Sequence, residues 1–294
     1  MYMLLEEEKT KNQFSKLTNR WNSGSLKWEI KENELPMWVA DMDFEIPPEL
    51  KQILLDRVNH GVFGYTESDD EYFDVLQNWF STRFNWIPEQ KWLVKTPGIV
   101  FALAMAVRAF TKEGEGVLIN QPVYYPFSMV IDDNNRHLIN VPLIKGEERY
   151  TIDFEGIERA IVEENVTLFL LCNPHNPVGR VWTEDELKRL GDICIKHNVL
   201  IVSDEIHADF VWKGHTHKVF AALGESYAEH CIVCTAPSKT FNIAGLQVSN
   251  IFIPNDSLRR RFIKEIDRAG YSQLNTMGIV GCEGAYKVGA PWLD

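Results

Sequence analysis

The sequence predicts an α/β fold, a three-layer α/β/α arrangement around a mostly parallel sheet. Two observations predict it: short β-rich runs recur along the chain, and helical patterns lie between them. Strands that alternate with helices form βαβ units, whose parallel sheet is covered by helices on both faces. With 294 residues the chain is long enough for one large domain or two smaller ones.

Helices are predicted where apolar residues recur at helical spacing between start and stop signals. Gly61 stops the first, and the second opens at Ser68, ahead of a run of acidic residues. A nearly all-apolar stretch indicates a buried helix, and the capping box of Thr183 and Glu186 begins another. The expected helices are 48–60, 68–83, 99–110 and 183–197.

Strands are expected at the β-rich runs that lie between these helices, and one more should end at Lys95-Thr96. In open parallel sheets, ligands bind beyond the carboxyl ends of the strands. The segments that follow each run are therefore the places to look for chemistry. The runs are Gly116–Asn120, Leu138–Val141, Val166–Leu171, Val199–Ser203, Cys231–Thr235 and Ser249–Ile253.

Composition excludes several classes of protein. The 30 basic and 42 acidic residues leave a net charge of −12, which argues against a nucleic-acid partner. No apolar run approaches the roughly 18 residues that a membrane span needs, and Met1–Phe14 mixes Glu and Lys, unlike a signal peptide. The odd number of cysteines predicts no disulfide framework, so we expect a cytoplasmic protein. Cys231 and Cys234 form a C-x-x-C inside a strand, where they should point to opposite faces rather than bind metal.

Two segments after expected strands suit parts of a phosphorylated aromatic ligand. In Lys95–Val100 a strand ends in Pro-Gly before a helix, whose free N–H groups suit a phosphate, although Pro-Gly is more often only a turn. In Gln121–Pro126 the aromatic residues suit stacking on a flat ring, but ordinary core aromatics account for them equally well. Alone, neither segment specifies a ligand.

Three more segments carry polar or charged groups past expected strands. Cys172–Gly179 contains two Asn-Pro pairs and a Gly, which cannot continue the strand, and both a functional and an ordinary loop stay open. Asp204 and Lys239 each follow an apolar strand. Alone, such a carboxylate usually caps a helix and such a lysine is usually a surface residue. In one crevice they would serve as a pyridinium partner and a Schiff-base amine.

Together these segments resemble the fold-type I enzymes that depend on pyridoxal 5'-phosphate (PLP). Asn-Pro-x-Asn-Pro-x-Gly is followed, 28 residues after Asn176, by Asp204 in Ser-Asp-Glu-Ile-His, and 35 residues later by Lys239 in Ser-Lys-Thr-Phe-Asn. Leu35–Phe44 and Ser238–Leu246 are similar to the MalY/PatB-type cystathionine β-lyase, or C–S lyase, branch of this class I/II aminotransferase superfamily. The resemblance extends from about residue 14 to the C-terminus and implies the PLP-dependent transferase-like fold for the large domain.

The resemblance implies catalytic roles for three residues. Lys239 would form the Schiff base and take the Cα proton, Asp204 would pair with the pyridine nitrogen, and Tyr124 would stack on the ring. Asn176 would donate to the phenolic oxygen of PLP. The other cofactor contacts that it implies are Gly98, Ile99, Val100, His207, Ser238 and Tyr65.

The resemblance also implies partners. Tyr65 matches a tyrosine that reaches the phosphate of the neighbouring subunit, which implies a homodimer with shared sites. The substrate is an amino acid, for which Ala40 would present backbone to the carboxylate beside Asn176. Tyr125 is a candidate for proton traffic around the leaving group. We expect no metal, nucleic acid or membrane partner.

Two departures from the general aminotransferase pattern favour the lyase branch. His207 stands where many aminotransferases have Tyr, and Gly245–Asn250 lacks their Arg. The resemblance divides the chain into an N-terminal arm (1–47) that adds to the small domain and the dimer contact, a PLP-binding large domain (48–287) and the start of a C-terminal small domain (288–294). Most of that small domain, with the Arg that usually binds the substrate carboxylate, is expected to be absent from this sequence, so no residue is assigned that role.

The expected reaction is β-elimination on L-cystathionine or related cysteine S-conjugates, which gives a thiol, pyruvate and ammonia. A PLP-dependent aminotransferase would use the same residues, and it would differ by returning the proton to the cofactor. Pyruvate formed without a keto-acid acceptor separates the two. A regulatory or binding protein, or an inactive fragment of the same fold, also stays open.

Overall fold

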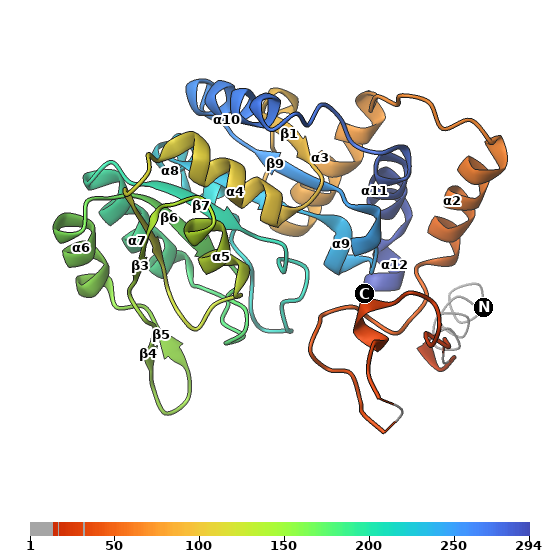
Figure 1. Cartoon of the computed structure of the whole chain (residues 1–294), viewed down its shortest axis with the longest axis horizontal. Helices are drawn as coiled ribbons and strands as arrows, with labels where there is room; N and C mark the ends of the chain where they lie inside the picture. Colours follow the sequence, from red (N-terminus) through yellow and green to blue (C-terminus); the bar gives the residue numbers. More distant parts are fainter. Residues whose placement is uncertain (1–13, 17, 32) are drawn as a thin grey trace.

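A seven-stranded sheet forms the middle of three layers, in the order β1-β9-β8-β7-β6-β2-β3 (Figure 1). The structure is a computed structural model that describes residues 14–16, 18–31 and 33–294; the expectation about a signal peptide falls almost wholly outside these residues. The strands of the sheet are β1 (Leu93–Thr96), β2 (Gly116–Ile119), β3 (His137–Asn140), β6 (Val166–Cys172), β7 (Leu200–Asp204), β8 (Cys231–Thr235) and β9 (Ser249–Phe252). A separate hairpin pairs β4 (Ile144–Lys145) with β5 (Tyr150–Thr151).

The prediction of a mostly parallel sheet is confirmed. Strands β3, β2, β6, β7 and β8 pair in parallel, and β9 alone runs against its neighbours β8 and β1. Between β8 and β9 the chain turns back at the carboxyl edge of the sheet instead of crossing over a face, and only antiparallel strands can be joined in that way. The sequence pattern contained no sign of this reversal.

The four predicted helices form, with bounds that lie within two residues of the expected ones. They are α2 (Pro48–His60), α3 (Asp70–Phe84), α4 (Ile99–Phe110) and α7 (Glu184–Lys196). The further helices are α5 (Pro126–Asp132), α6 (Phe154–Glu163), α8 (Glu225–Ala228), α9 (Pro237–Thr240), α10 (Asp256–Arg268), α11 (Thr276–Val288) and α12 (Ala290–Leu293). Short 3-10 turns are η1 (Leu26–Trp28), η2 (Gln90–Trp92), η3 (Phe220–Leu223) and η4 (Ala244–Leu246).

The residues that the sequence indicated as helix ends form the expected capping interactions. Gly61 ends α2 in the left-handed region at φ 77°, and its N–H donates to the Val58 carbonyl. At α7 the Thr183 hydroxyl accepts from the Glu186 N–H while the Glu186 carboxylate accepts from the Thr183 N–H. These reciprocal bonds satisfy donors that the first turn of a helix leaves free.

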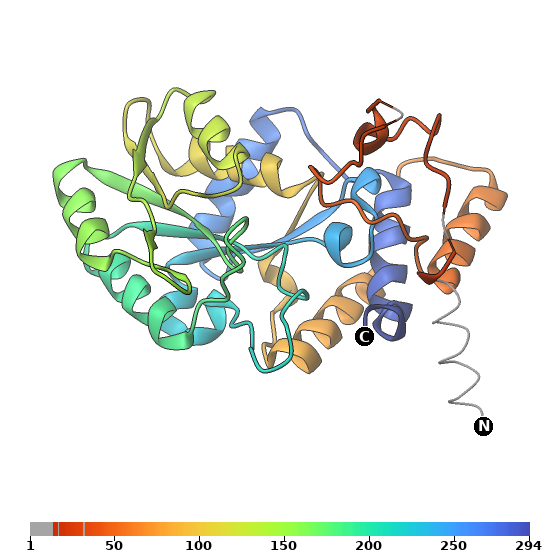
Figure 2. The same ribbon diagram turned by 90° about the horizontal axis from the view of Figure 1, so that it is seen from below.

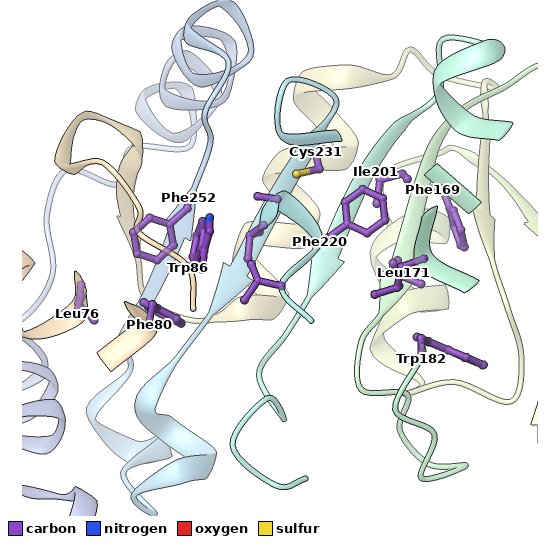
Figure 3. Close-up of a cluster of buried hydrophobic side chains, with 14 of the residues drawn as sticks. Leu76, Phe80, Trp86, Phe169, Leu171, Trp182, Ile201, Phe220, Cys231 and Phe252 are labelled. Carbon is purple, nitrogen blue, oxygen red and sulfur yellow. The ribbon is translucent and has the colours of Figure 1, made fainter. Parts of the chain in front are cut away.

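Two apolar clusters, one on each face of the sheet, make up the core. Along β6, Phe169 and Leu171 point into the cluster shown in Figure 3, whereas Leu168 and Leu170 join the cluster under α4 and α10. Both faces are covered by helices (Figure 2), which confirms the three-layer prediction. Cys231 and Cys234 lie in opposite clusters as expected.

Two features are absent from the part of the chain that the structure describes. Within the described ranges, no helix is long and apolar enough to cross a membrane. Over the same residues, no group of three or more His, Cys, Asp or Glu side chains is placed to hold a metal ion.

Candidate active site

Asp204 and Lys239 come together at the carboxyl edge of the sheet. Asp204 is the last residue of β7 and is 4% exposed, between Cys172 of β6 and Cys234 of β8. Lys239 lies in α9, directly after β8, and its charge acts on the Asp204 carboxyl. The neighbouring parallel strands thus bring together two residues that are 35 positions apart.

The Asp204 carboxyl is poised between its two protonation states. Burial raises its pKa from the usual value to about 7, with a smaller contribution from Glu205. A hydrogen bond from the Ile206 N–H (3.1 Å) and the charge of Lys239 act in the opposite direction. A buried carboxyl of this kind is a good site for a cationic ring nitrogen, since no described residue forms an ion pair with it.

Lys239 lines a cavity of about 380 Å³. Asn176 from the loop after β6, His207 from the loop after β7 and Ala40 from the N-terminal segment line it too. Burial, followed by the charge of Lys239, lowers the pKa of His207 to about 4, so its imidazole is neutral at pH 7. Four of the residues named from the sequence therefore share one cavity.

Tyr124 lies close to this group without lining the cavity. Its pKa is raised by burial, by Tyr125 and by Asp204, which places its hydroxyl within electrostatic reach of the Asp204 carboxyl. The ring is 38% exposed and contacts the Tyr125 ring edge-on at 5.2 Å between centroids. An open ring face beside Asp204 is what stacking on a cofactor requires. Tyr125 is 65% exposed and is thus more open to solvent than Tyr124.

The start of α4 offers an anion site at the same edge of the sheet. Gly98 precedes the helix, and no side chain caps the first turn, so the N–H groups of Ile99 and Val100 have no partner inside the helix. An added Cβ at Gly98 would meet no atom within 4 Å. The free donors and the open space suit a phosphate, which helix N-termini bind. Ser238, half-buried and next to Lys239, lies in α9.

Tyr65 is not brought to the Lys239 cavity within one chain. Its side chain is 98% exposed, and it lies in a separate hollow with Pro97, Gln247 and Thr276. Thr66 holds this segment through a 2.8 Å hydrogen bond between its hydroxyl and that of Thr276. Another hollow of about 570 Å³ lies at the amino ends of the strands, at the opposite edge from the chemistry.

The N-terminal segment reaches the cavity because Asn242 holds it there. The Asn242 Oδ1 accepts from the Met42 N–H (3.1 Å), and its Nδ2 donates to the carbonyls of Met42 (3.1 Å) and Phe44 (3.0 Å). Asn242 follows Lys239 by three residues, just after α9, so the same short stretch carries the lysine and fixes the backbone on the other side of the cavity. Ala40 owes its place in the lining to this contact.

The lining residues that the sequence did not point to include Met42, Phe210 and Trp212. Met42 lies inside a stretch that carried the resemblance, but it has no polar atom to draw attention. Phe210 and Trp212 follow the Ser-Asp-Glu-Ile-His motif directly, and this closeness was the available signal. Apolar side chains give no sequence signal that separates a cavity lining from an ordinary core.

The chain belongs to the aminotransferase class I and II family, whose pattern matches residues 35–280. Among its relatives is cystathionine β-lyase PatB of Bacillus subtilis, 44% identical over 96% of this chain and 74% of that protein. Solved structures with the same fold include PLP-containing cystalysin of Treponema denticola (TM-score 0.91, 42% identity, 95% and 73% of the two chains). A PLP-bound C–S lyase of Staphylococcus hominis has a TM-score of 0.88 at 34% identity, over 95% and 72% of the chains.

Proposed function

We propose that this chain is a PLP-dependent carbon–sulfur lyase that acts by β-elimination on L-cystathionine or related cysteine S-conjugates. The observation that carries the proposal is the joint placement of Lys239, Asp204, Asn176 and His207 at one edge of the sheet. The proteins to which the chain is similar include a cystathionine β-lyase and a C–S lyase, which supports the same reaction. The products would be a thiol, pyruvate and ammonia.

The residues present fit PLP by three independent features. The open space beside Gly98 and the free N–H groups of α4 suit the phosphate. The buried Asp204 suits the pyridinium nitrogen, because a cation there stabilises a charge that burial otherwise disfavours. The exposed face of Tyr124 suits the ring.

Each residue has a defined role in this proposal. PLP, when bound, supplies an electron-accepting ring that stabilises negative charge at the substrate Cα. Lys239 attaches the cofactor and then removes the Cα proton at its Nζ. Asp204 keeps the ring nitrogen protonated, and Asn176 donates to the phenolic oxygen. The neutral His207 would help to hold the ring, and Ser238 would offer a hydroxyl to the phosphate.

The substrate side of the site is proposed from the lining residues. Ala40 presents backbone to the substrate carboxylate, in a position that Asn242 holds. Tyr125 moves a proton near the leaving thiol, since its ring contacts Tyr124 at the rim of the site. General acid–base help of this kind contributes about 10²–10⁴-fold.

We also propose the organisation of the protein. Residues 1–47 act as an arm, 48–287 form the PLP-binding domain and 288–294 begin a small domain. The exposed Tyr65 supports a homodimer in which this tyrosine reaches the neighbouring site. All five cysteines are free thiols, as is usual in a reducing compartment, which supports a cytoplasmic location.

The test is a pyruvate assay on the purified chain with PLP and L-cystathionine, without a keto acid. The wild type should release pyruvate, and Lys239→Ala should release none while its far-UV circular dichroism stays unchanged. Lys91→Ala, which removes an exposed lysine of η2, is the matched control and should keep its activity. Pyruvate from Lys239→Ala would contradict the mechanism, and amino transfer that needs a keto acid would identify an aminotransferase instead.

A further inference from the structure

The lining of the Lys239 cavity is unusually poor in charge. Eight of its twelve residues are apolar. Lys239 is already assigned to the cofactor and the Cα proton, and burial lowers the pKa of both His175 and His207 to about 4, so both imidazoles are neutral at pH 7. No carboxylate and no arginine is among the described residues that line the cavity. A substrate group that carries its own charges would therefore lose water there without gaining an opposite charge.

Two aromatic side chains dominate the apolar part of the lining. Phe210 is 40% exposed and Trp212 is 85% exposed, although both face the cavity. The Phe210 ring lies beside the His207 ring, with 6.3 Å between centroids. Large apolar side chains left open beside a reactive lysine are typical of ligand pockets, in which they are covered when the ligand binds.

The segment that carries these rings, residues 209–217, is anchored at both ends. At its start Asp209 accepts hydrogen bonds from the Thr240 hydroxyl (2.7 Å) and the Trp79 indole (3.2 Å). Thr240 is the neighbour of Lys239, so this end is tied to the helix that bears the lysine. The start of the segment is thus fixed relative to the reacting group.

The other end of segment 209–217 is held by a buried carboxylate. Glu205 is 2% exposed and accepts from His217 Nε2 (2.8 Å), the Ser203 hydroxyl (2.8 Å) and the Phe220 N–H (2.9 Å). These bonds satisfy the carboxylate entirely inside the protein. Both ends of the segment are therefore held in place, which lowers the cost of ordering it around a substrate.

We propose that segment 209–217 selects cysteine conjugates whose S-substituent is apolar and uncharged, such as a benzyl group, over L-cystathionine. Phe210 and Trp212 contact that substituent, and they are specificity-determining residues. The inference rests on the proposed function and narrows its substrate class. The leaving thiol of L-cystathionine carries an ammonium and a carboxylate, for which the lining offers no partner.

The reaction balances without any further reactant except water. The Cα–H and Cβ–S bonds break, the Cα proton passes to Lys239, and the sulfur leaves with its bonding pair and takes a proton. Water then displaces nitrogen from the remaining three-carbon unit. Conjugate and water thus give one thiol, one pyruvate and one ammonium, with no change in overall oxidation state.

The test compares kcat/KM for pyruvate release from S-benzyl-L-cysteine, S-methyl-L-cysteine and L-cystathionine. The wild type should prefer S-benzyl-L-cysteine to L-cystathionine by about tenfold or more. Trp212→Ala should lower the ratio of the benzyl to the methyl substrate about tenfold, and Trp212→Phe should restore most of it. Ile144→Ala, an exposed apolar residue of the β4–β5 hairpin, is the matched control and should keep the wild-type ratio.

Two results would overturn the inference: a preference for L-cystathionine, or an equal loss on the benzyl and methyl substrates in Trp212→Ala. Calorimetric measurement of the Kd of each substrate tests the inference independently of the proposed function, because binding does not require turnover. If no substrate gives pyruvate, the proposed function is wrong. A tenfold tighter Kd for S-benzyl-L-cysteine than for L-cystathionine, lost in Trp212→Ala, would still support contact of Phe210 and Trp212 with the S-substituent. Equal Kd values would refute it.

Discussion

Asp204→Asn is expected to stabilise the cofactor-free chain at high pH while it removes catalysis. In the folded chain the Asp204 carboxyl binds a proton up to about pH 7, because burial disfavours its charge. In the unfolded chain it loses that proton near pH 4. Between these values only the folded state holds the proton, so wild-type stability falls as the pH rises.

The size of the effect follows from the separation of the two pKa values. About three pH units correspond to about 4 kcal/mol, which is lost from the free energy of unfolding between pH 4 and pH 7. Asn has no proton to lose, and its side-chain oxygen can still accept from the Ile206 N–H. The advantage of Asp204→Asn over the wild type should therefore grow across that interval and level off above it.

Urea unfolding of the cofactor-free chain at several pH values from 4 to 8.5 measures this difference. Asp74→Asn changes an exposed carboxylate on α3 and serves as the control, for which a difference within about 0.5 kcal/mol is expected at every pH. PLP should stabilise the wild type more than Asp204→Asn, since the neutral amide offers no charge to the ring nitrogen. A difference between Asp204→Asn and wild type that does not change with pH would refute the reasoning.

Two further predictions concern the phosphate site and the ion pair of Glu186 with Arg180 at the start of α7. Gly98→Ala should keep the wild-type Tm, because its Cβ meets open space. It should weaken PLP binding about tenfold, as measured by absorbance titration. An unchanged PLP affinity would show that Gly98 is not part of the phosphate site. Glu186→Gln should lower the free energy of unfolding by about 2 kcal/mol, since it removes the negative charge and one of the two oxygens that accept from the buried Arg180 at 2.8 Å. A thermal melt showing no change would contradict this.

The secondary structure was largely predictable because its signals are local. Apolar spacing, Gly61 and the capping box at Thr183 act over a few residues, and the helices formed where they indicated. The direction of β9 was not predictable, because it depends on how the chain turns at the edge of the sheet after α9. That choice is made by packing between elements far apart in sequence.

The site was predictable only in part. Its polar members stood out because Asp204 and Lys239 each follow an apolar strand, and a parallel sheet brings such positions together. Tyr65 could be named but not placed, since within one chain it lies in a different hollow from Lys239. The roles of the named residues remain predictions that the variants above test.

The family, the alternation of strands with helices, and the identity of the polar groups that meet at one edge of the sheet follow from the sequence alone. These depend on local patterns and on residue types at fixed spacing. The raised pKa of Asp204 and the meeting of Phe210 and Trp212 with Lys239 in one cavity exist only in the folded chain. Burial and the meeting of distant segments set both properties, and neither is encoded in any short stretch of the chain.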